Sequence, residues 1–234
     1  MGSLVLIDAD IVAYRCAASC KPEDPVEVCQ TRIASLIREI VTQVGATEYR
    51  SFLSGPRNWR KDLYPLYKAN RKQEPPKWLQ QAKEYLIVQF DAEMSDGLEA
   101  DDEIGIAKAS NPEAVIASID KDFRQFSGRI YDFVKAESFF IDPVSATQFF
   151  YQQLLLGDKT DNVPGFDGKP RQRPTKQIEY WWGVLEETPD ERDMYELVYD
   201  AYDQGGGDFE LTSQLLYIWR KNPDHWRPGF EQEV

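Results

Sequence analysis

Two apolar runs that each end at an aspartate constrain the fold of this chain more than any other feature. Residues 4–7 are Leu-Val-Leu-Ile and are followed by Asp8, and the largely apolar residues 114–119 are followed by Asp120. Continuous apolar runs of this length are typical of strands that a parallel sheet buries on both faces. We therefore predict a parallel α/β sheet with carboxylates at the carboxyl ends of its strands, the edge where the functional sites of such sheets gather.

Strand and helix patterns alternate along the rest of the first 142 residues. Further strands are predicted at residues 49–53, 130–133 and 138–141. Amphipathic helices are predicted from about residue 11, at 26–44, at 76–90 and from residue 99. This alternation predicts a mostly parallel central sheet flanked by helices. From residue 143 onward the pattern is largely helical, so we predict an α/β core over residues 1–142 and a helical region over residues 143–234 that packs on it.

The composition and the cysteines place the chain in a broad class. The 234 residues include no apolar run near the roughly 20 residues that a membrane span needs, and the amino terminus has no basic leader pattern. Three cysteines, Cys16, Cys20 and Cys29, leave an odd thiol however they pair, which favours a reducing compartment. We therefore predict a cytoplasmic protein without a membrane partner. The single histidine, His225, disfavours both histidine-based acid-base catalysis and the common zinc patterns.

The charge of the chain is unevenly distributed. The net charge is −13, from 27 basic and 40 acidic residues, which by itself disfavours a polyanionic partner. Residues 57–77, however, carry seven Lys or Arg against two acidic residues, and residues 168–177 carry four against none. An acidic body with two basic segments suits a protein that contacts nucleic acid along one track, although charge alone also allows two solvated loops.

Eight carboxylates are placed so that the predicted fold brings them to one end of the sheet. They follow strands, open a helix or lie in a turn, and are Asp8, Glu99, Asp101, Asp102, Asp120, Asp122, Asp158 and Asp161. A helix cap or a solvated turn explains any one of them, but carboxylates crowded together repel one another unless cations lie among them. Oxygen ligands without His or Cys select Mg²⁺ or Mn²⁺ over zinc. Two such ions about 4 Å apart are the standard device for hydrolysing a phosphodiester.

Five motifs in one order carry a resemblance to a known family. They are Leu6–Asp10, Tyr67–Arg71, Glu99–Asp102, Ser118–Gln125 and Leu156–Gly165. Together they resemble the 5′-nuclease, or flap endonuclease, superfamily, above all the small phage 5′-to-3′ exonucleases and the 5′-nuclease domain of bacterial DNA polymerase I. The match runs from about residue 3 to residue 165. The resemblance implies a PIN-like 5′-nuclease fold with a modified helix-three-turn-helix in the helical third.

The resemblance also implies roles for individual residues. It implies that the eight carboxylates bind two Mg²⁺ or Mn²⁺ ions, with Asp158 and Asp161 in the second metal region. Lys68 resembles the active-site lysine of the family and Arg71 resembles its phosphate-steering arginine. These two residues and Asp120 are the implied catalytic residues.

The first basic segment, residues 57–77, resembles the element of the family through which DNA threads. Residues 57–77 would form or approach the helical arch of the family, and Tyr67 stands where the family often stacks an aromatic ring on a terminal base. The expected DNA-contacting residues combine both basic segments and are Arg57, Arg60, Lys61, Tyr67, Lys68, Arg71, Lys72, Lys169, Arg171 and Arg173.

Two positions depart from the family pattern. Ser54 follows the second predicted strand where the family usually has an aspartate, so we expect one metal ligand fewer there. Residues 166–175, with two prolines and several basic residues, replace a glycine-rich turn followed by Lys-Thr-Ala. We expect direct phosphate contacts from Lys169, Arg171 and Arg173 in place of duplex binding through a bound monovalent cation.

These observations predict a Mg²⁺-dependent 5′-to-3′ exonuclease or flap endonuclease that acts at the 5′ ends of duplex DNA. RNA primers and RNA–DNA hybrids form a second expected substrate class. The expected setting is phage DNA replication in the host cytoplasm, by a monomeric protein. Three alternatives stay open: a non-catalytic DNA-structure-binding module, motivated by Ser54; an RNA-cleaving relative with the same sheet; and, less favoured, a haloacid-dehalogenase-like phosphatase, motivated by the Asp-Ala-Asp sequence at residues 8–10.

Overall fold

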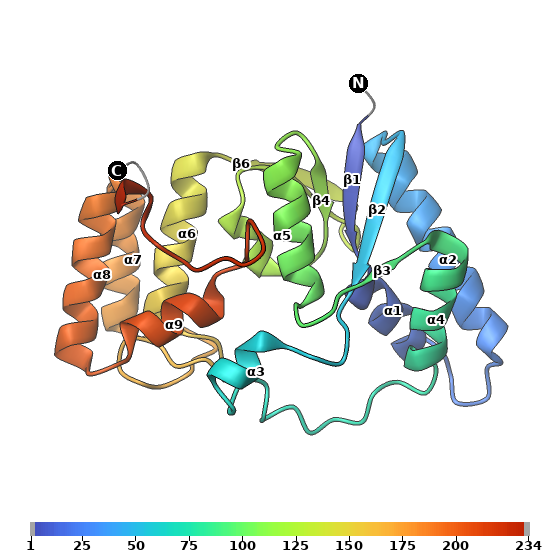
Figure 1. Cartoon of the computed structure of the whole chain (residues 1–234), viewed down its shortest axis with the longest axis horizontal. Coiled ribbons are helices and arrows are strands. Elements are labelled where there is room, and N and C mark those ends of the chain that lie inside the picture. Colours follow the sequence, from blue (N-terminus) through green and yellow to red (C-terminus); the bar gives the residue numbers. More distant parts are fainter. Residues whose placement is uncertain (1–2, 232–234) are drawn as a thin grey trace.

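A six-stranded sheet forms the centre of this computed structural model, which describes residues 3–231 (Figure 1). The strands are β1 (Leu4–Asp8), β2 (Glu48–Leu53), β3 (Glu93–Met94), β4 (Val115–Ala117), β5 (Gly128–Asp132) and β6 (Glu137–Ile141). They lie in the order β3-β2-β1-β4-β5-β6, and each neighbouring pair is parallel except β5 and β6. The predicted fold class, a mostly parallel sheet flanked by helices, is confirmed.

Helices cover both faces of the sheet because alternate residues of each strand point to opposite sides. In β1, Val5 and Ile7 pack into one core and Leu6 packs into another. The helices of the first core are α1 (Ala9–Ala18), α2 (Val26–Val44) and α4 (Leu79–Phe90), and the helix of the second is α5 (Ala100–Ser110). The amino end of α5 is thereby held at the carboxyl edge of the sheet.

The chain after β6 is largely helical and has a core of its own beside the sheet (Figure 1). Its helices are α6 (Pro143–Leu156), α7 (Lys176–Glu187), α8 (Glu191–Gly205) and α9 (Phe209–Leu216). Tyr151, Leu154 and Val198 are fully buried in this core, and Tyr67 and Leu98 from the first half of the chain join it. The boundary between two regions near residue 142 stays a prediction.

Sequence reasoning missed one short strand and one short α-helix, and it misplaced the starts of two helices, since α1 begins at Ala9 rather than at about residue 11. α2 has the predicted bounds, whereas α4 begins at Leu79 rather than at residue 76. The missed elements are the two-residue strand β3 and the short helix α3 (Trp59–Leu63). α3 begins where the Asn58 side chain accepts a hydrogen bond from the Arg60 backbone N–H at 2.9 Å, a capping contact that stabilises a helix start.

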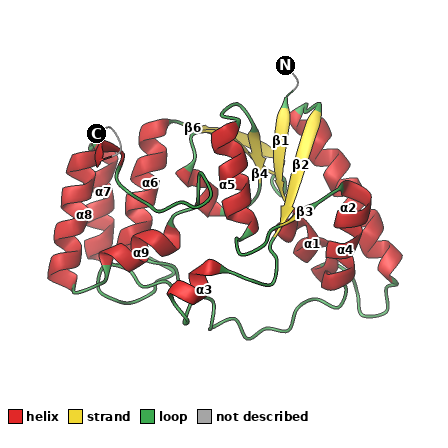
Figure 2. Cartoon of the chain, in the orientation of Figure 1, coloured by secondary structure: helices red, strands yellow, loops and turns green. Residues whose placement is uncertain are grey.

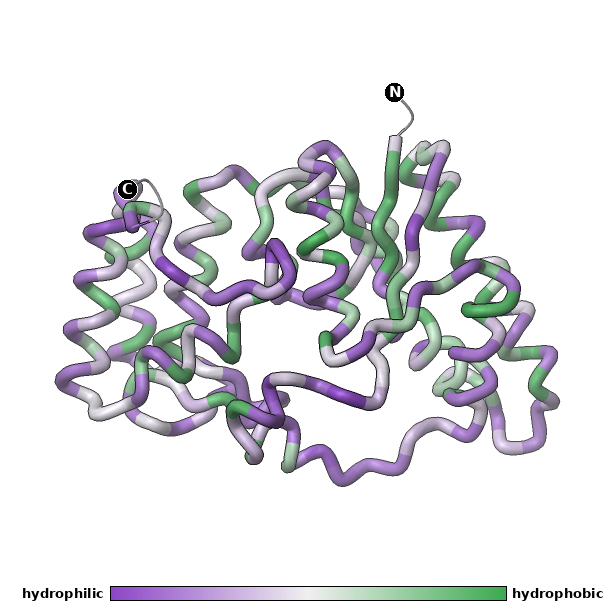
Figure 3. Tube along the Cα trace, in the orientation of Figure 1, coloured by the Kyte–Doolittle hydropathy of each residue, from purple (hydrophilic) through white to green (hydrophobic). Residues whose placement is uncertain are grey.

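The first basic segment is largely irregular outside α3. Residues 64–78 carry no helix or strand and are mostly hydrophilic (Figures 2 and 3). In Figure 1 this stretch lies between α3, close to α9, and α4 on the other side of the molecule. No helix among residues 3–231 is long and apolar enough to cross a membrane.

Candidate active site

The carboxyl edge of the sheet carries two aspartates on neighbouring strands. Asp8 ends β1 and caps α1, since its Oδ1 accepts a hydrogen bond from the Ile11 N–H at 3.1 Å. Ser118, just after β4, donates its hydroxyl to Asp8 Oδ2 at 2.7 Å. Asp120 follows and caps a short 3₁₀ helix by accepting from the Asp122 N–H at 2.9 Å. The strand ends thus fix these carboxylates side by side, as the apolar runs predicted.

Four carboxylates repel one another at this edge, and we name them the crowded carboxylates. They are Asp8, Asp101, Asp120 and Asp122. Burial is the largest cause that raises the pKa of each, and neighbouring carboxylates raise it further. For Asp8 and Asp122 the pKa reaches about 7. Ionised carboxylates are therefore unfavourable in this part of the fold, and a bound cation would offset their repulsion.

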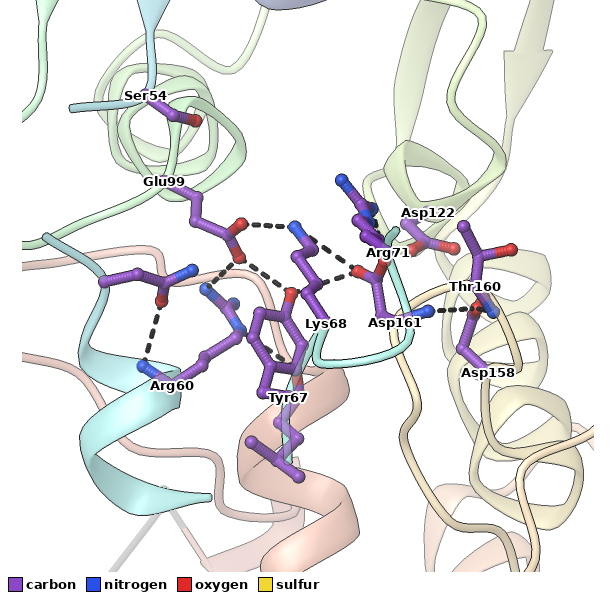
Figure 4. Close-up of polar contacts among 12 residues, drawn as sticks. Ser54, Arg60, Tyr67, Lys68, Arg71, Glu99, Asp122, Asp158, Thr160 and Asp161 are labelled. Atoms are coloured by element: carbon purple, nitrogen blue, oxygen red, sulfur yellow. Dashed lines mark hydrogen bonds and ion pairs between the residues drawn. The ribbon is translucent and has the colours of Figure 1, made fainter. Parts of the chain in front are cut away.

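The other four carboxylates each lie within hydrogen-bond distance of a lysine or arginine of the chain, whereas Asp122 of the crowded group has Lys121 only at 3.7 Å, and we name these four the paired carboxylates. They are Glu99, Asp102, Asp158 and Asp161. Glu99 caps α5, and its two oxygens contact Lys68, Arg60 and the Tyr67 hydroxyl (Figure 4). Although burial opposes ionisation, Lys68 and Arg60 hold the pKa of Glu99 at about 2. Glu99 is consequently a permanent anion.

Asp158 and Asp161 are presented by a tight turn that follows α6. Asp158 Oδ1 accepts the N–H groups of Thr160 and Asp161, at 2.6 and 3.1 Å, and Lys121 lies 2.8 Å from its other oxygen. Burial acts to raise the pKa of Asp158, but Lys121 and these hydrogen bonds outweigh it and the pKa is lowered. Asp161 contacts Arg71 and lies 3.4 Å from Lys68 Nζ. The carboxylates of Asp158 and Asp161 therefore each lie against basic side chains of the chain.

Backbone contacts carry Lys68 to the carboxylates. The Lys68 N–H donates to the Asp161 carbonyl at 2.8 Å, and the side-chain amides of Asn70 and Asn162 donate to the carbonyls of Lys159 and Leu66. Lys68 itself has a φ of 56°, a left-handed conformation that costs energy for a side chain of this type. The motif at residues 67–71 is thus fastened to the motif at residues 158–162, and Lys68 lies between Glu99 and Asp161 (Figure 4).

Asp102 is more fully hydrogen-bonded by the protein than the other expected metal ligands. Both of its oxygens are occupied, because it accepts two hydrogen bonds from the Arg60 guanidinium, one from the Trp59 indole and one each from the backbone N–H groups of Glu99 and Trp219. Its side chain is fully buried. That Asp102 binds a metal ion stays a prediction, and to do so the carboxylate would have to give up some of these hydrogen bonds.

Two of the expected DNA-contacting residues are also buried. The Arg60 guanidinium lies against Asp102, and Tyr67, 4% exposed, directs its hydroxyl to Glu99 and Asp161 at 2.8 and 3.0 Å. A phosphate cannot reach the first side chain, and a base has no open ring face at the second. The expectations for Arg60 and for stacking on Tyr67 are therefore corrected, because both side chains belong to the interior of the site.

The remaining expected DNA contacts are at the surface or partly so. Arg57 pairs with Asp96 in an exposed contact, and Arg171 bonds to Asp167. Arg71 is half-exposed while it contacts Asp161. Four others have exposed side chains, and these are Lys61, Lys72, Lys169 and Arg173. The structure thus divides the two basic segments into cations that hold carboxylates and cations that are open to solvent.

Ser54 stands after β2, where the family pattern has an aspartate. Its hydroxyl accepts a hydrogen bond from the Ala100 N–H at 2.9 Å, and its own N–H donates to Asp10 Oδ2 at 2.8 Å. Asp10 also pairs with Lys83 at 2.6 Å. Sequence reasoning missed Asp10, Lys83 and Lys121. Asp10 and Lys121 had a signal, since they lie within the first and the fourth motif, whereas Lys83 had none.

A small cavity of about 20 Å³ lies among these side chains, about enough for one water molecule. Its lining includes carboxylates of both groups, namely Glu99, Asp101, Asp122, Asp158 and Asp161. Within residues 3–231, no three acidic, histidine or cysteine side chains are arranged to hold a metal ion as they stand, since the paired carboxylates turn to the chain's own cations. The donor chemistry of the crowded carboxylates fits a hard divalent cation.

Comparisons with known sequences agree with these motifs. A family model described as the 5′-3′ exonuclease, N-terminal resolvase-like domain, matches residues 3–149. Flap endonuclease Xni of Shewanella putrefaciens is 28% identical over 186 residues, which cover 72% of this chain and 71% of that protein. DNA polymerase I of Rhizobium leguminosarum is 31% identical over 129 residues, which cover 48% of this chain and 13% of that protein.

A solved structure shares the fold. The bacteriophage T5 flap endonuclease, solved as a pseudo-enzyme-product complex with DNA and metal ions, is similar with a TM-score of 0.65 and 18% sequence identity. The similarity covers 93% of this chain and 89% of that one. The common architecture therefore extends beyond residue 149 into the helical part of the chain.

Proposed function

This chain belongs to the 5′-3′ exonuclease family whose N-terminal resolvase-like domain it matches, and we propose that it cleaves DNA at 5′ ends and flaps with the help of divalent cations. Membership gives the activity class, a nuclease of the flap endonuclease and 5′-3′ exonuclease type. The observation that carries the proposal is the turn that brings Lys68 and Arg71 onto carboxylates at the carboxyl edge of the sheet.

We propose the crowded carboxylates as the ligands of Mg²⁺ or Mn²⁺. Their raised pKa values support this role, because a bound cation would offset both their burial and their mutual repulsion. A divalent cation supplies positive charge that activates water and stabilises the leaving oxygen of a phosphodiester. Asp158 and Asp161 are proposed to serve a second ion, and Glu99 lines the same cavity. Asp102 would join this set only by giving up some of its hydrogen bonds to the protein.

The basic side chains of the site are proposed to move between carboxylates and substrate. Lys121 and Arg71 have side chains that are 50% and 53% exposed while they pair with Asp158 and Asp161. Each is therefore able to turn to a phosphate oxygen without crossing the protein interior. Lys68 is more enclosed, with a side chain 16% exposed, and is proposed to stabilise charge on the phosphate that is cleaved.

The substrate is proposed to be DNA with a 5′ end or flap, held along the exposed basic residues of both segments. Lys61 and Lys72 supply the first part of this track, and Lys169 and Arg173 supply the second. Action on RNA–DNA hybrids, a monomeric state and a role in phage DNA replication belong to the same proposal. Ser54 favours one competing function, a module that binds DNA structures without cleaving them.

The deciding experiment is cleavage of 5′-labelled and 3′-labelled duplex and flap DNA in Mg²⁺, in Mn²⁺ and in EDTA, together with a binding titration. We expect short products from the 5′ label that require the metal. Binding without cleavage in either metal would reject the nuclease and favour the DNA-structure-binding module. Matched DNA and RNA flaps in the same assay decide between the two substrate classes.

A further inference from the structure

We infer that Arg60 is a positioning residue, which fixes Glu99 and through it places Lys68 for catalysis. The inference rests on the proposed nuclease function, since it concerns the same site. Arg60 contacts no carboxylate of the crowded group and, at 3% exposure, cannot contact DNA. Its effect on the reaction must therefore pass through the residues that it holds.

The Arg60 guanidinium is fully engaged by the protein. Its Nη1 and Nη2 atoms donate to the two oxygens of Asp102 at 2.6 and 2.8 Å, a planar two-bond contact. Nε donates to the Leu215 carbonyl at 2.9 Å, and Nη2 donates to the Tyr217 carbonyl at 2.7 Å. Nη1 also donates to Glu99 Oε2 at 3.2 Å. One side chain thus links α3, α5 and the end of α9.

Two tryptophans complete the enclosure. The Trp59 and Trp219 ring centroids lie 5.0 Å apart, and the Arg60 guanidinium lies 4.6 Å from the Trp59 centroid. The Trp59 indole N–H and the Trp219 backbone N–H both donate to Asp102, at 3.1 and 3.2 Å. The arginine and its carboxylate partner are therefore held as a unit, because each bonds to the other and each is also bonded to the surrounding chain, Arg60 to two carbonyls and Asp102 to two N–H groups.

Glu99 connects this unit to the catalytic lysine. Its Oε2 atom accepts from Arg60 and from the Tyr67 hydroxyl, while its Oε1 atom contacts Lys68 Nζ. Without Arg60, Glu99 would lose one of the contacts that set its orientation and would face a partly uncompensated Asp102. Lys68 would then lose its defined position, and a misplacement of about 1 Å is enough to cost about a hundredfold in rate.

A purely stabilising role accounts less well for this arrangement. Replacing a buried ion pair with well-packed apolar side chains is often neutral or favourable for stability, so burial of Arg60 with Asp102 is not required to hold α3 in place. The planar two-bond geometry, the link to Glu99 and the proximity of Lys68 instead favour a requirement for precise orientation.

The test compares Arg60→Gln with a matched control, Arg50→Gln. Arg50 makes the same two-bond contact with Glu93, at 2.7 and 2.8 Å, and lies 4.8 Å from the Phe52 ring centroid, but its side chain is 42% exposed and remote from the site. We expect Arg60→Gln to lower kcat by about tenfold to a hundredfold while KM for flap DNA changes by less than about threefold. Arg50→Gln should stay within about twofold of the wild type.

A double-mutant cycle separates positioning from general stability. In a Lys68→Ala background, Arg60→Gln should add little further loss of kcat, because Arg60 acts through the Glu99–Lys68 contact. Losses that multiply, or an Arg60→Gln enzyme with wild-type kcat, would overturn the inference. Arg60→Lys keeps the charge without the planar fork and should recover part of kcat.

Folding and the underlying function are controlled separately. All variants are assayed at a temperature at which each has the native circular dichroism spectrum. Trp59→Phe removes the indole N–H to Asp102 but keeps an aromatic ring beside Arg60, and it should lower kcat in the same direction by a smaller factor. Unchanged kcat in both Trp59→Phe and Arg60→Lys would reject the positioning role. Absence of cleavage by the wild type rejects the proposed function itself, whereas wild-type cleavage with an unaffected Arg60→Gln variant rejects only the positioning role.

Discussion

The crowded and the paired carboxylates occupy one edge of one sheet but differ in how their charge is compensated. The paired group, which includes Glu99 and Asp102, lies against lysines and arginines of the same chain. The crowded group, which includes Asp8 and Asp120, faces other carboxylates, and its pKa values are raised. The difference teaches that the first group is stabilised by the fold itself, whereas burial and mutual repulsion oppose ionisation of the second, which a cation from outside would offset.

The largest expected effect is the loss of cleavage when a crowded carboxylate is removed. Asp120→Ala should lower kcat by about a thousandfold or more, roughly 4 kcal/mol, because it deletes a proposed metal ligand at the strand end. DNA affinity should change by less than about threefold, since removing negative charge does not weaken phosphate binding. Single-turnover cleavage and a parallel binding titration measure the two quantities.

The control for this variant is Asp193→Ala, which removes an exposed carboxylate from the first turn of α8. It should leave both cleavage and binding at wild-type values. Cleavage by Asp120→Ala at more than a tenth of the wild-type rate would contradict the assignment of the crowded carboxylates to the metal.

The next prediction compares how substitutions at two neighbouring residues of α5 change the free energy of unfolding. Asp102→Asn should destabilise the protein by about 3 kcal/mol, because it leaves the Arg60 cation buried without its full counter-charge. Asp101→Asn should be neutral or stabilising in the absence of metal, because it removes a repelled charge. Urea unfolding of both variants in EDTA measures the difference. Equal losses of stability in the two variants would erase the distinction between the groups.

The placement of Asp8 and Asp120 at one edge of the sheet could be predicted from the sequence for a simple physical reason. The apolar runs before Asp8 and Asp120 are read locally, and parallel strands must end at the same edge. The bounds of α2 were likewise predicted from its regular apolar spacing. These features depend on residues that are close together in the sequence or on a general rule of sheet topology.

The members of the paired group were predicted as site residues, but their ion pairs were not, because the partners are distant in the sequence. Arg60 meets Asp102 across 42 residues and meets the Tyr217 carbonyl across 157. Before the fold is known, such an arginine in a basic segment looks like any phosphate-binding residue. Tyr67 was predicted to stack on a base for the same reason, since nothing in the adjacent sequence indicates that its ring is buried in the helical core. Long-range pairing, not local pattern, decides which charges of a basic segment are structural.

A smaller effect is expected from pH in the metal-free protein. Asp8 and Asp122 have pKa values near 3.8 when unfolded and about 7 when folded, so between these values the folded state binds protons that the unfolded state has released. Stability should therefore fall as the pH rises from 5 to 7 and then level off. Glu99, with a pKa of about 2, stays ionised throughout and contributes no slope over this range.

The pH dependence of stability should change when metal is added. At about ten times its Kd, Mg²⁺ should stabilise the folded protein by about 1.4 kcal/mol, and the rise in melting temperature should be larger at pH 8 than at pH 5, because protons compete with the cation for the carboxylates. Thermal melts at pH 5, 6, 7 and 8 with Mg²⁺ or EDTA provide the data. A melting temperature that rises from pH 5 to 7 in EDTA would contradict the crowding.

The smallest effect comes from moving one carboxylate from the paired to the crowded group. Lys121→Gln removes the cation that lies 2.8 Å from Asp158, and because the lysine side chain is half-exposed the loss of stability should be less than about 1 kcal/mol. The pKa of Asp158 should then rise, since burial would act on it without opposition from Lys121. Calorimetric titration with Mn²⁺ should give tighter binding than in the wild type, because a competing internal cation is gone. Weaker Mn²⁺ binding would mean that Lys121 orients Asp158 for the metal rather than competing with it, and the boundary between the two groups would then lie elsewhere.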